Sequence, residues 1–250
     1  MALRVQVRLY GDLGRFAPAG ADELERRLAE PTTTKDLIES VGVPHTEVEL
    51  ILVDGEPSSL GRLVGDGERV AAFPHLYALD GQTPMPLRPA LAGPPRFVLD
   101  GHLGRLAGYL RMLGVDALYR RDASDDALAQ MSAREGRVLL TRDRGLLKRS
   151  LVVHGYCPRS DDPERQLAEV VARFDLTRVA APFSRCMLCN GQLEPVEKAS
   201  VEARLEPKTR RYYDEFARCR GCERVFWKGS HHQRMERLLA RVLGERPASG

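Results

Sequence analysis

Four acidic residues in the middle of the chain stand where α/β proteins often place polar chemistry. Asp100 follows the apolar run FVL, Asp143 follows VLLTR, and Asp125 and Asp126 begin the helical pattern between those runs. Because the carboxyl ends of parallel strands meet at one sheet edge, we expect these side chains to converge. Converging carboxylates repel one another unless a cation neutralises them. The pattern therefore predicts a Mg²⁺ or Mn²⁺ site that could activate water for attack on a phosphodiester.

Each acid also has a purely structural explanation. Asp143 could cap the short helix RGLLKRS, and Asp100 could cap the helix that follows it. Asp125 and Asp126 could stabilise a helix dipole from its first turn. These explanations stay open for the individual residues, but together they explain less well why acids recur at the edge of one sheet.

Three basic side chains stand close to Asp143 in the sequence. Arg142 and Arg144 flank it, and Lys148 follows in the same short helix. At a phosphate-cleaving centre, strand alternation would turn one arginine toward the crevice and the other away. We expect Arg144 to hold a phosphate, with Arg142 the alternative and Lys148 a further nucleic-acid contact. The structural alternative is that the arginines only balance surface charge.

Four of the five cysteines form two Cys-x-x-Cys pairs, in SRCMLCNGQL and ARCRGCERVFW. Each pair turns two thiolates to one side of a tight loop, and two facing pairs complete a tetrahedral zinc shell. Cys186, Cys189, Cys219 and Cys222 therefore predict a closed, structural Zn²⁺ site, with a redox dithiol or unrelated free thiols as the alternatives. The segment 190–218 between the pairs is longer than is common and predicts a helical insertion around VEKASVEARLEP.

An aromatic residue, a cation and two histidines follow the second cysteine pair, in VFWKGSHHQRMERLLARVL. Trp227, Lys228 and His231 offer a stacking surface, a positive charge and a donor for RNA contact. The alternative is that Trp227 packs against the metal module while the histidines face solvent. The end of this segment predicts an amphipathic helix.

Periodicity places these residues on the elements of three domains. Residues 1–80 alternate as strand, helix, strand, turn and strand, the order of an α+β β-grasp domain. The stretch 81–95 contains five prolines and predicts a linker. Residues 96–182 alternate short apolar strands with helices, which predicts an α/β domain with a parallel sheet. Residues 183–243 hold the cysteine pairs and the last helix, and the tail from residue 244 is expected to be disordered.

Composition and charge disfavour some classes of protein, such as membrane-spanning ones, and favour others. The chain has 250 residues, 43% of them hydrophobic, and no apolar run approaches the ~18 residues of a transmembrane helix. The N-terminus lacks a signal-peptide core and the cysteine pattern suits a reducing compartment, so we expect a cytoplasmic protein with no membrane partner. Residues 1–80 carry 8 basic and 14 acidic side chains, whereas residues 81–250 carry 30 and 21. The second part is therefore the better candidate for binding a polyanion.

The N-terminal residues resemble the ubiquitin-like sulfur carriers of cofactor biosynthesis. Those carriers need a free C-terminal Gly-Gly, whereas the corresponding stretch here, AAFPHLYALDG, has none and continues into the linker. We therefore expect a docking or regulatory module rather than a sulfur carrier.

The rest of the chain resembles a nuclease family. FVLDGHLGRLAGYLRMLGVDALY, DDALAQMSAREGRVLLTRDRGLLKR, SRCMLCNGQL and WKGSH resemble the Mut7-C RNase domain, a PIN-like nuclease fold joined to a zinc ribbon, over about residues 96–240. A ubiquitin-like domain is a known companion of that family. The resemblance implies that Asp100, Asp126 (or Asp125 in the alternative register) and Asp143 are the metal-binding acids. PIN sites often hold a fourth acid after the third, and none follows Asp143 here, so the number of metal ions stays open.

These observations lead to two functional expectations. The first is a metal-dependent ribonuclease acting on tRNA, rRNA or mRNA, whose ubiquitin-like domain contacts the ribosome or a protein partner. The second is a non-cleaving RNA- or ribosome-binding regulatory protein with a degraded or occluded site. A weaker resemblance of LDG to aspartyl phosphatases is disfavoured, because those enzymes need an acid at the position where His102 stands.

Overall fold

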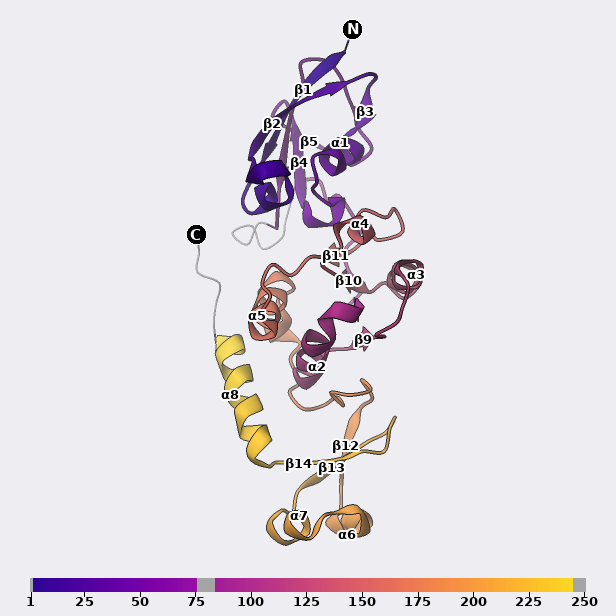
Figure 1. The fold of residues 1–250 in the computed structure, drawn as a ribbon, viewed down its shortest axis with the longest axis vertical. Coiled ribbons are helices and arrows are strands. Elements are labelled where there is room, and N and C mark those ends of the chain that lie inside the picture. The colour runs from indigo at the N-terminus through magenta and orange to yellow at the C-terminus, as the bar shows by residue number, and fades with distance from the viewer. Residues whose placement is uncertain (1, 76–83, 245–250) are drawn as a thin grey trace. The chain divides into compact units, whose positions relative to one another are not determined.

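The structure is a computed structural model that describes residues 2–75 and 84–244 (Figure 1). The chain forms two compact units. Among the described residues, unit 1 contains those up to Ala92 together with Ser124–Cys157, and unit 2 contains Gly93–Ala123 together with residues 158–244. Residues 81–83 of the expected linker and the expected disordered tail beyond residue 244 lie outside the described residues. The predicted domain boundaries at residues 80, 95 and 182 stay predictions.

The N-terminal part of unit 1 is a β-grasp domain, as the sequence predicts. Its five-stranded sheet has the order β2-β1-β7-β4-β5, and β1 and β7 are parallel. Alternation along β1 buries Val5, Val7 and Leu9 and exposes the residues between them, so one face of the sheet forms the core. The strands of the main sheet are β1 (Leu3–Leu9), β2 (Glu23–Leu28), β4 (Leu50–Val53), β5 (Glu56–Ser58) and β7 (Arg69–Phe73). A separate antiparallel pair consists of β3 (Thr32–Thr33) and β6 (Leu63–Val64).

Helix α1 (Thr34–Ser40) packs into the core of this domain and begins and ends by local signals. The hydroxyl of Thr33 accepts a hydrogen bond from the backbone N–H of Asp36 at 3.0 Å, which caps the first turn. After the helix, Gly42 has a φ of +103°, and a Cβ at this position would lie 2.4 Å from the carbonyl oxygen of Phe16. Only glycine fits this turn, so Gly42 sets where the chain leaves the helix.

The described part of the expected linker is attached to the β-grasp domain through Arg88. Its side chain is largely buried, and its guanidinium donates hydrogen bonds to the carbonyl oxygens of His45, Thr46 and Val48. The same guanidinium lies 3.6 Å from the carboxylate of Glu49. A single arginine thus fixes a stretch whose proline-rich composition predicts only a spacer.

Residues 124–157 complete unit 1. They form α3 (Asp125–Glu135), β10 (Val138–Leu140), α4 (Arg144–Leu147) and β11 (Gly155–Tyr156). β10 is fully buried and pairs in parallel with β11. Ser124 caps α3 with its hydroxyl, and Gly136 ends the helix in the left-handed conformation, so local residues set both ends of this helix.

Unit 2 begins with a second parallel pair of strands. β8 (Phe97–Leu99) and β9 (Ala117–Tyr119) are parallel, and α2 (Gly104–Met112) connects them. The apolar stripe of α2 is fully buried at Leu106, Ala107 and Leu110. Helix α5 (Pro163–Arg173) packs against α2. The parallel pairing confirms the expected α/β character, while the PIN-like topology stays a prediction. Short 3-10 turns are η5 (Gly101–Leu103) and η6 (Leu176–Arg178).

The C-terminal part of unit 2 is a three-stranded antiparallel sheet of order β12-β13-β14. Its elements are β12 (Leu193–Val196), β13 (Phe216–Cys219), β14 (Val225–Trp227) and the final helix α8 (Ser230–Gly244). The insertion between the cysteine pairs contains α6 (Lys198–Val201), a 3-10 turn η7 (Glu202–Arg204) and α7 (Pro207–Tyr212), so the predicted helical insertion is confirmed. The amphipathic α8 buries Leu238, Leu239 and Val242.

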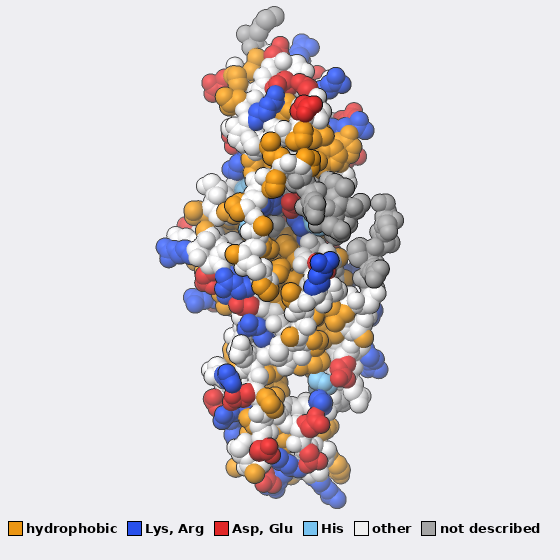
Figure 2. All heavy atoms as spheres, turned by 180° about the vertical axis from the view of Figure 1, so that it is seen from behind, with side chains coloured by type: hydrophobic (Ala, Val, Ile, Leu, Met, Phe, Trp, Pro, Cys, Tyr) orange, Lys and Arg blue, Asp and Glu red, His pale blue; other side chains and the backbone are white. Residues whose placement is uncertain are grey.

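The surface carries mixed charge. On the face drawn in Figure 2, positive and negative side chains are interspersed rather than gathered into one patch. The net positive charge of the second part of the chain therefore does not form a continuous basic surface on this face. Within residues 2–75 and 84–244, no helix combines the length and the apolar composition needed to cross a bilayer.

Candidate functional site

Asp143 lies directly before α4 and caps it. Its Oδ1 accepts hydrogen bonds from the backbone N–H groups of Gly145 at 2.7 Å and Leu146 at 3.2 Å. The hydroxyl of Thr141 in turn accepts from the N–H of Asp143 at 2.9 Å, which holds the turn after β10. Both cap bonds fall on one carboxylate oxygen, and none of the described residues donates to Oδ2. The structural role anticipated for Asp143 is thus present, and it leaves one carboxylate oxygen of this exposed residue without a cap bond.

Asp125 and Asp126 occupy the first turn of α3, where acids favour the helix dipole. Ser124, not either acid, provides the side-chain cap. The Asp126 carboxylate forms an ion pair with Arg149 and is 76% exposed. Asp125 is exposed as well. Asp126 is therefore held near the segment that follows α4, within the same unit as Asp143.

Asp100 follows β8 at the entrance of η5. Its backbone is extended, and its side chain makes no cap hydrogen bond to that turn. The capping explanation for Asp100 therefore fails. Asp100 belongs to unit 2 whereas Asp126 and Asp143 belong to unit 1, so the convergence of the three carboxylates stays a prediction.

The basic residues after Asp143 contact the β-grasp domain. The guanidinium of Arg144 donates to the carbonyl oxygens of Phe16 at 2.9 Å and Arg15 at 3.4 Å, and lies 5.0 Å from the centre of the Phe16 ring. The Lys148 ammonium donates to the carbonyl oxygen of Glu39 at 2.7 Å. Burial lowers the pKa of Lys148, and the Glu39 carboxylate partly opposes this. Arg144 and Lys148 thus hold the α4 segment to the N-terminal domain, and their predicted contact with RNA stays a prediction.

The buried His45 strengthens the same attachment. Its Nδ1 lies 2.6 Å from a Glu39 carboxylate oxygen and its Nε2 lies 3.0 Å from the carbonyl oxygen of Val152. The carboxylate of Glu47, also buried, accepts a hydrogen bond from the backbone N–H of Cys157 at 2.6 Å. Arg142 and Arg144 are both exposed after β10.

The four predicted cysteines come together in unit 2. The Sγ atoms of Cys186, Cys189, Cys219 and Cys222 all lie within 4.8 Å of one another, and could hold a metal ion. The distance is 3.7 Å between Cys186 and Cys222 and 3.3 Å between Cys189 and Cys219. Zinc–sulfur bonds of ~2.3 Å in a tetrahedron imply sulfur–sulfur edges of about 3.8 Å. The cluster therefore has the dimensions of a four-thiolate metal site.

Backbone donors around the cluster stabilise thiolates. The N–H groups of Gly221 and Cys222 point at Cys219 Sγ at 3.3 and 3.4 Å, and that of Gly191 points at Cys189 Sγ at 3.4 Å. Burial raises the pKa of Cys219, but these hydrogen bonds outweigh it and lower the pKa to about 7. Burial raises the pKa of Cys189 to about 12. Metal ligation requires the thiolate form at all four positions, so metal binding would release protons.

Arg111 and Asn190, which the sequence does not mark as site residues, attach this cluster to the α/β part of unit 2. Arg111 on α2 is buried and donates to the carbonyl oxygens of Ala117 at 2.8 Å, Met187 at 3.1 Å and Leu188 at 2.8 Å. Burial lowers the pKa of Arg111, and negative charge on the nearby cysteine thiols opposes the shift. The first cysteine loop is therefore held by a buried cation from a helix some 75 residues earlier in the chain.

Asn190 makes the second attachment. It adopts a positive φ of 71° directly after the first cysteine pair, and its side chain is almost fully buried. Its Oδ1 accepts from the N–H of Ala117 at 3.1 Å, while its Nδ2 donates to the Asp116 carboxylate at 2.7 Å. The start of β9 is thus hydrogen-bonded to the cysteine loop. Nothing in the sequence around Arg111 marks it as a contact of the cluster, whereas an asparagine directly after Cys-x-x-Cys is at least compatible with a left-handed turn.

The predicted RNA-contacting residues after the second cysteine pair lie at the end of β14. Trp227 is 41% exposed and borders a pocket of about 490 Å³ that Phe216 and Phe226 also line. Lys228 donates to the carboxylate of Glu215 at 2.6 Å, which raises the pKa of Lys228. His231 is exposed in the first turn of α8. Trp227 is therefore not buried, and its role in stacking on a base stays a prediction.

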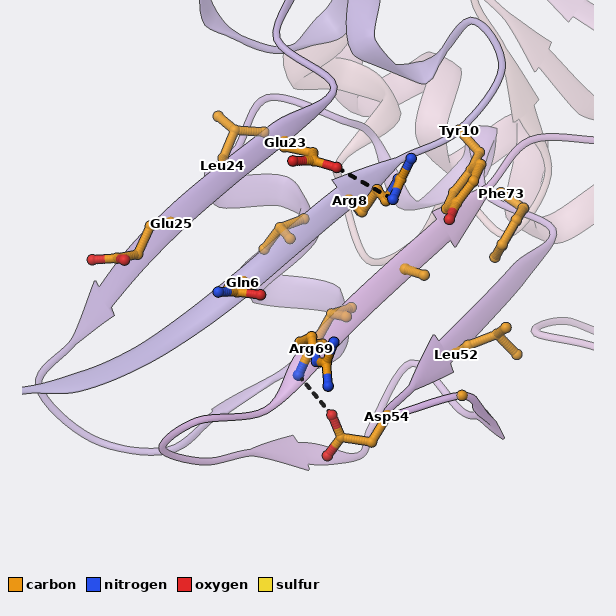
Figure 3. Close-up of a pocket in the computed structure, with 14 residues that line it drawn as sticks. Gln6, Arg8, Tyr10, Glu23, Leu24, Glu25, Leu52, Asp54, Arg69 and Phe73 are labelled. Carbon is orange, nitrogen blue, oxygen red and sulfur yellow. Dashed lines mark hydrogen bonds and ion pairs between the residues drawn. The ribbon is translucent and has the colours of Figure 1, made fainter.

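A second hollow, of about 850 Å³, lies on the outer face of the β-grasp sheet (Figure 3). Arg8 pairs with Glu23 across it at 3.3 Å, and the Asp54 carboxylate accepts from the N–H of Arg69 at 2.9 Å. At its edge the rings of Tyr10 and Phe73 stack 4.2 Å apart. None of the site residues predicted from the sequence lines this hollow.

The geometry defines a protein with an N-terminal β-grasp domain and a further region of paired parallel strands that ends in a four-cysteine cluster. The family model of the Mut7-C RNase domain matches residues 95–239, and the model of the Mut7-C ubiquitin domain matches residues 2–80. The chain therefore belongs to the Mut7-C RNase family and carries that family's ubiquitin-like domain. The resemblance that the sequence motifs indicate is confirmed.

Solved structures similar to the chain are small β-grasp proteins. They include small archaeal modifier protein 1 of H. volcanii, at 20% identity and a TM-score of 0.25, and a putative molybdopterin converting factor subunit 1 from Pyrococcus furiosus, at 27% identity and a TM-score of 0.24. Each comparison covers 29% of this chain and 97% of the other. No curated protein matches the chain.

Proposed function

We propose that the chain is a metal-dependent ribonuclease that hydrolyses RNA phosphodiester bonds. The match of residues 95–239 to the Mut7-C RNase domain is the observation that carries this proposal. The position of Asp143 after a buried parallel strand supports it, because such strand ends are where α/β proteins place their sites. The exposed Asp126 carboxylate in the same unit adds a second ligand candidate.

In this proposal Asp100, Asp126 and Asp143 hold Mg²⁺ or Mn²⁺, with Asp125 the alternative to Asp126. The donor set suits these hard cations, since carboxylate oxygens are their preferred protein ligands. The cap bonds of Asp143 use Oδ1 and leave Oδ2 for a metal. When bound, the ion would activate water and neutralise charge on the phosphate. Arg149, paired with Asp126, would orient that carboxylate.

The four-cysteine cluster is assigned to Zn²⁺ with a structural role. Four thiolates complete a tetrahedral shell and leave no open position for a substrate or water. The hydrogen bonds from Arg111 and Asn190 support this assignment, because they connect the cysteine loop to α2 and β9 rather than to a cavity. Zinc would thus stabilise unit 2 as a whole.

A cleavage assay with capping variants tests the proposal. Mixed RNA is incubated with purified protein and Mn²⁺, and wild type is compared with Asp143→Asn and Asp100→Asn. Asparagine caps helices about as well as aspartate, so Asp143→Asn keeps α4 while removing the charge. Asp162→Asn is the matched control, because Asp162 caps α5 with the same geometry, at 2.8 and 3.0 Å to two N–H groups. Cleavage should fall by at least about 100-fold in the first two variants, more than is typical for loss of a residue that only orients a metal ligand, and persist in the control.

A non-cleaving RNA- or ribosome-binding protein is the second candidate. It is favoured by one observation: Asp143, Arg144 and Lys148 all have structural partners inside unit 1. RNA binding without cleavage in any divalent metal would support this candidate. Cleavage that persists in Asp143→Asn and Asp100→Asn would instead show that the acids are wrongly assigned. A cytoplasmic location, the choice among tRNA, rRNA and mRNA, and a ribosomal or protein partner for the ubiquitin-like domain remain predictions.

A further inference from the structure

The insertion between the two cysteine pairs carries a compact basic segment. Residues 204–213, RLEPKTRRYY, contain four basic and one acidic side chain. Most of them lie on α7, whose Thr209 is buried against the module while Lys208, Arg210 and Arg211 are exposed. One side of this short helix is therefore anchored and the other presents positive charge.

The two acidic residues that follow α7 are neutralised by other partners, whereas the exposed Glu206 directly before it forms no ion pair within the described chain. Asp214 pairs with Lys198 at 2.8 Å and Glu215 pairs with Lys228 at 2.6 Å. Lys208 and Arg211 form no ion pair with any residue of the described chain. Arg210 has a distant one, 4.0 Å from Glu202, with both side chains half exposed. The uncompensated positive charge of this region therefore lies on α7, whereas Lys228, adjacent in sequence to Trp227, is already balanced.

Exposed aromatic side chains accompany this charge. Tyr212, the last residue of α7, is 67% exposed, and Trp227 is 41% exposed. Tyr213, the residue after Tyr212, has its ring centre 6.5 Å from that of Trp227. The guanidinium of Arg211 lies 5.5 Å from the centre of the Tyr212 ring. Large aromatic surfaces exposed beside cations are costly to leave in water and are typical of sites that stack on a ligand.

We propose that Lys208, Arg210, Arg211, Tyr212 and Trp227, here called the α7 surface, bind single-stranded RNA. Bases stack on Tyr212 and Trp227, and the three α7 cations hold the phosphates between them. The pocket beside Trp227 gives an unstacked base room to enter. Stacking requires bases that are not paired, so the surface selects single strands over duplexes. The inference rests on the proposed function only in taking RNA as the ligand.

The composition of the chain supplies a direct probe, because Trp227 is its only tryptophan. A 12-nucleotide oligouridylate is titrated into the full-length protein without added Mg²⁺ or Mn²⁺, with excitation of tryptophan alone. Stacking should quench the Trp227 emission saturably. Fluorescence anisotropy of a labelled copy of the same oligonucleotide gives the affinity independently of the tryptophan.

Two variants and a control test the surface. Tyr212→Ala should weaken binding by about 5- to 100-fold, the range for loss of one stacked base. Arg211→Ala should lower the slope of log affinity against log salt by about 0.7, since one fewer counterion is released from a single strand. Arg178→Ala, which removes an 81% exposed arginine of the same unit, should change neither. Unchanged zinc content in each variant shows that the cysteine module is still folded.

The results separate this inference from the proposed function. RNA binding by anisotropy without quenching, and with wild-type affinity in Tyr212→Ala, would overturn the α7 surface while leaving the ribonuclease intact. Quenching and loss of affinity in Tyr212→Ala, but no cleavage with Mn²⁺, would support the surface and remove the ribonuclease. No binding of the oligonucleotide at low salt would overturn the α7 surface whatever the cleavage assay gives.

Discussion

Replacement of Arg111 by methionine should lower both the free energy of unfolding of unit 2 and its affinity for zinc. Methionine keeps much of the aliphatic volume but removes the three hydrogen bonds to Ala117, Met187 and Leu188. The carbonyl oxygens of the cysteine loop then lose the donor that fixes them relative to α2. The metal site itself is not altered, so any effect on zinc must pass through this support.

The magnitude follows from the burial of each bond. A hydrogen bond from a charged donor contributes ~1.5–3 kcal/mol. The bond to Ala117 is buried, whereas the two to the cysteine loop are partly exposed and can be replaced in part by water. Removing the buried charge also recovers some desolvation free energy, the same effect that lowers the pKa of Arg111. We expect a loss of about 2–4 kcal/mol in the free energy of unfolding, and a 10- to 100-fold weaker hold on zinc.

Urea unfolding and zinc transfer to a chromophoric chelator measure the two effects. The matched control is Arg105→Met, an exposed arginine six residues earlier on the same helix, where the change should stay within ~0.5 kcal/mol. Equal stability and equal zinc release in the two variants would refute the coupling. Loss of stability without faster zinc release would show that Arg111 supports α2 and β9 but not the metal site.

Three further predictions concern separate parts of the chain. Cys222→Ser should reduce bound zinc to well below one ion per chain and loosen residues 183–240, as read by metal analysis and limited proteolysis; wild-type protein that folds without zinc would contradict it. Lys148→Met should lower the stability of unit 1 by about 1–2 kcal/mol in urea unfolding, because the carbonyl oxygen of Glu39 loses its charged donor. Asp143→Ala should lose about 1 kcal/mol relative to Asp143→Asn by the same measurement, and equal stabilities would show that the α4 cap contributes little.

Residues at the ends of helices and the alternation along strands account for much of the secondary structure. Ser124 and Gly136 bound α3, Gly42 follows α1, and the alternation of β1 gives the buried face of the β-grasp sheet. These features depend on residues only a few positions apart, so their physical causes are visible in the sequence. The same holds for the helix cap formed by Asp143, because its partners, the N–H groups of Gly145 and Leu146, are only two and three residues further along the chain.

The contact that Arg144 makes could not be predicted from its neighbours in the sequence. Charge and position beside Asp143 favour a phosphate contact, but the guanidinium reaches the carbonyl oxygen of Phe16, 128 positions away in the chain. Backbone carbonyl groups are present at every residue and leave no mark in the sequence. A basic side chain therefore looks the same in the sequence whether its partner will be a phosphate or a distant peptide group.

The sequence by itself determined the family, the β-grasp order of the first domain and the four cysteines, because each is encoded by residue types at short, fixed spacings. Only the tertiary structure decided what these parts are attached to. It grouped residues 124–157 with the N-terminal domain in unit 1, and it joined the cysteine loop to α2 and β9 through Arg111 and Asn190. Those contacts connect side chains to backbone groups about 75 or more positions away, and such pairings arise from the packing of folded elements rather than from any local pattern.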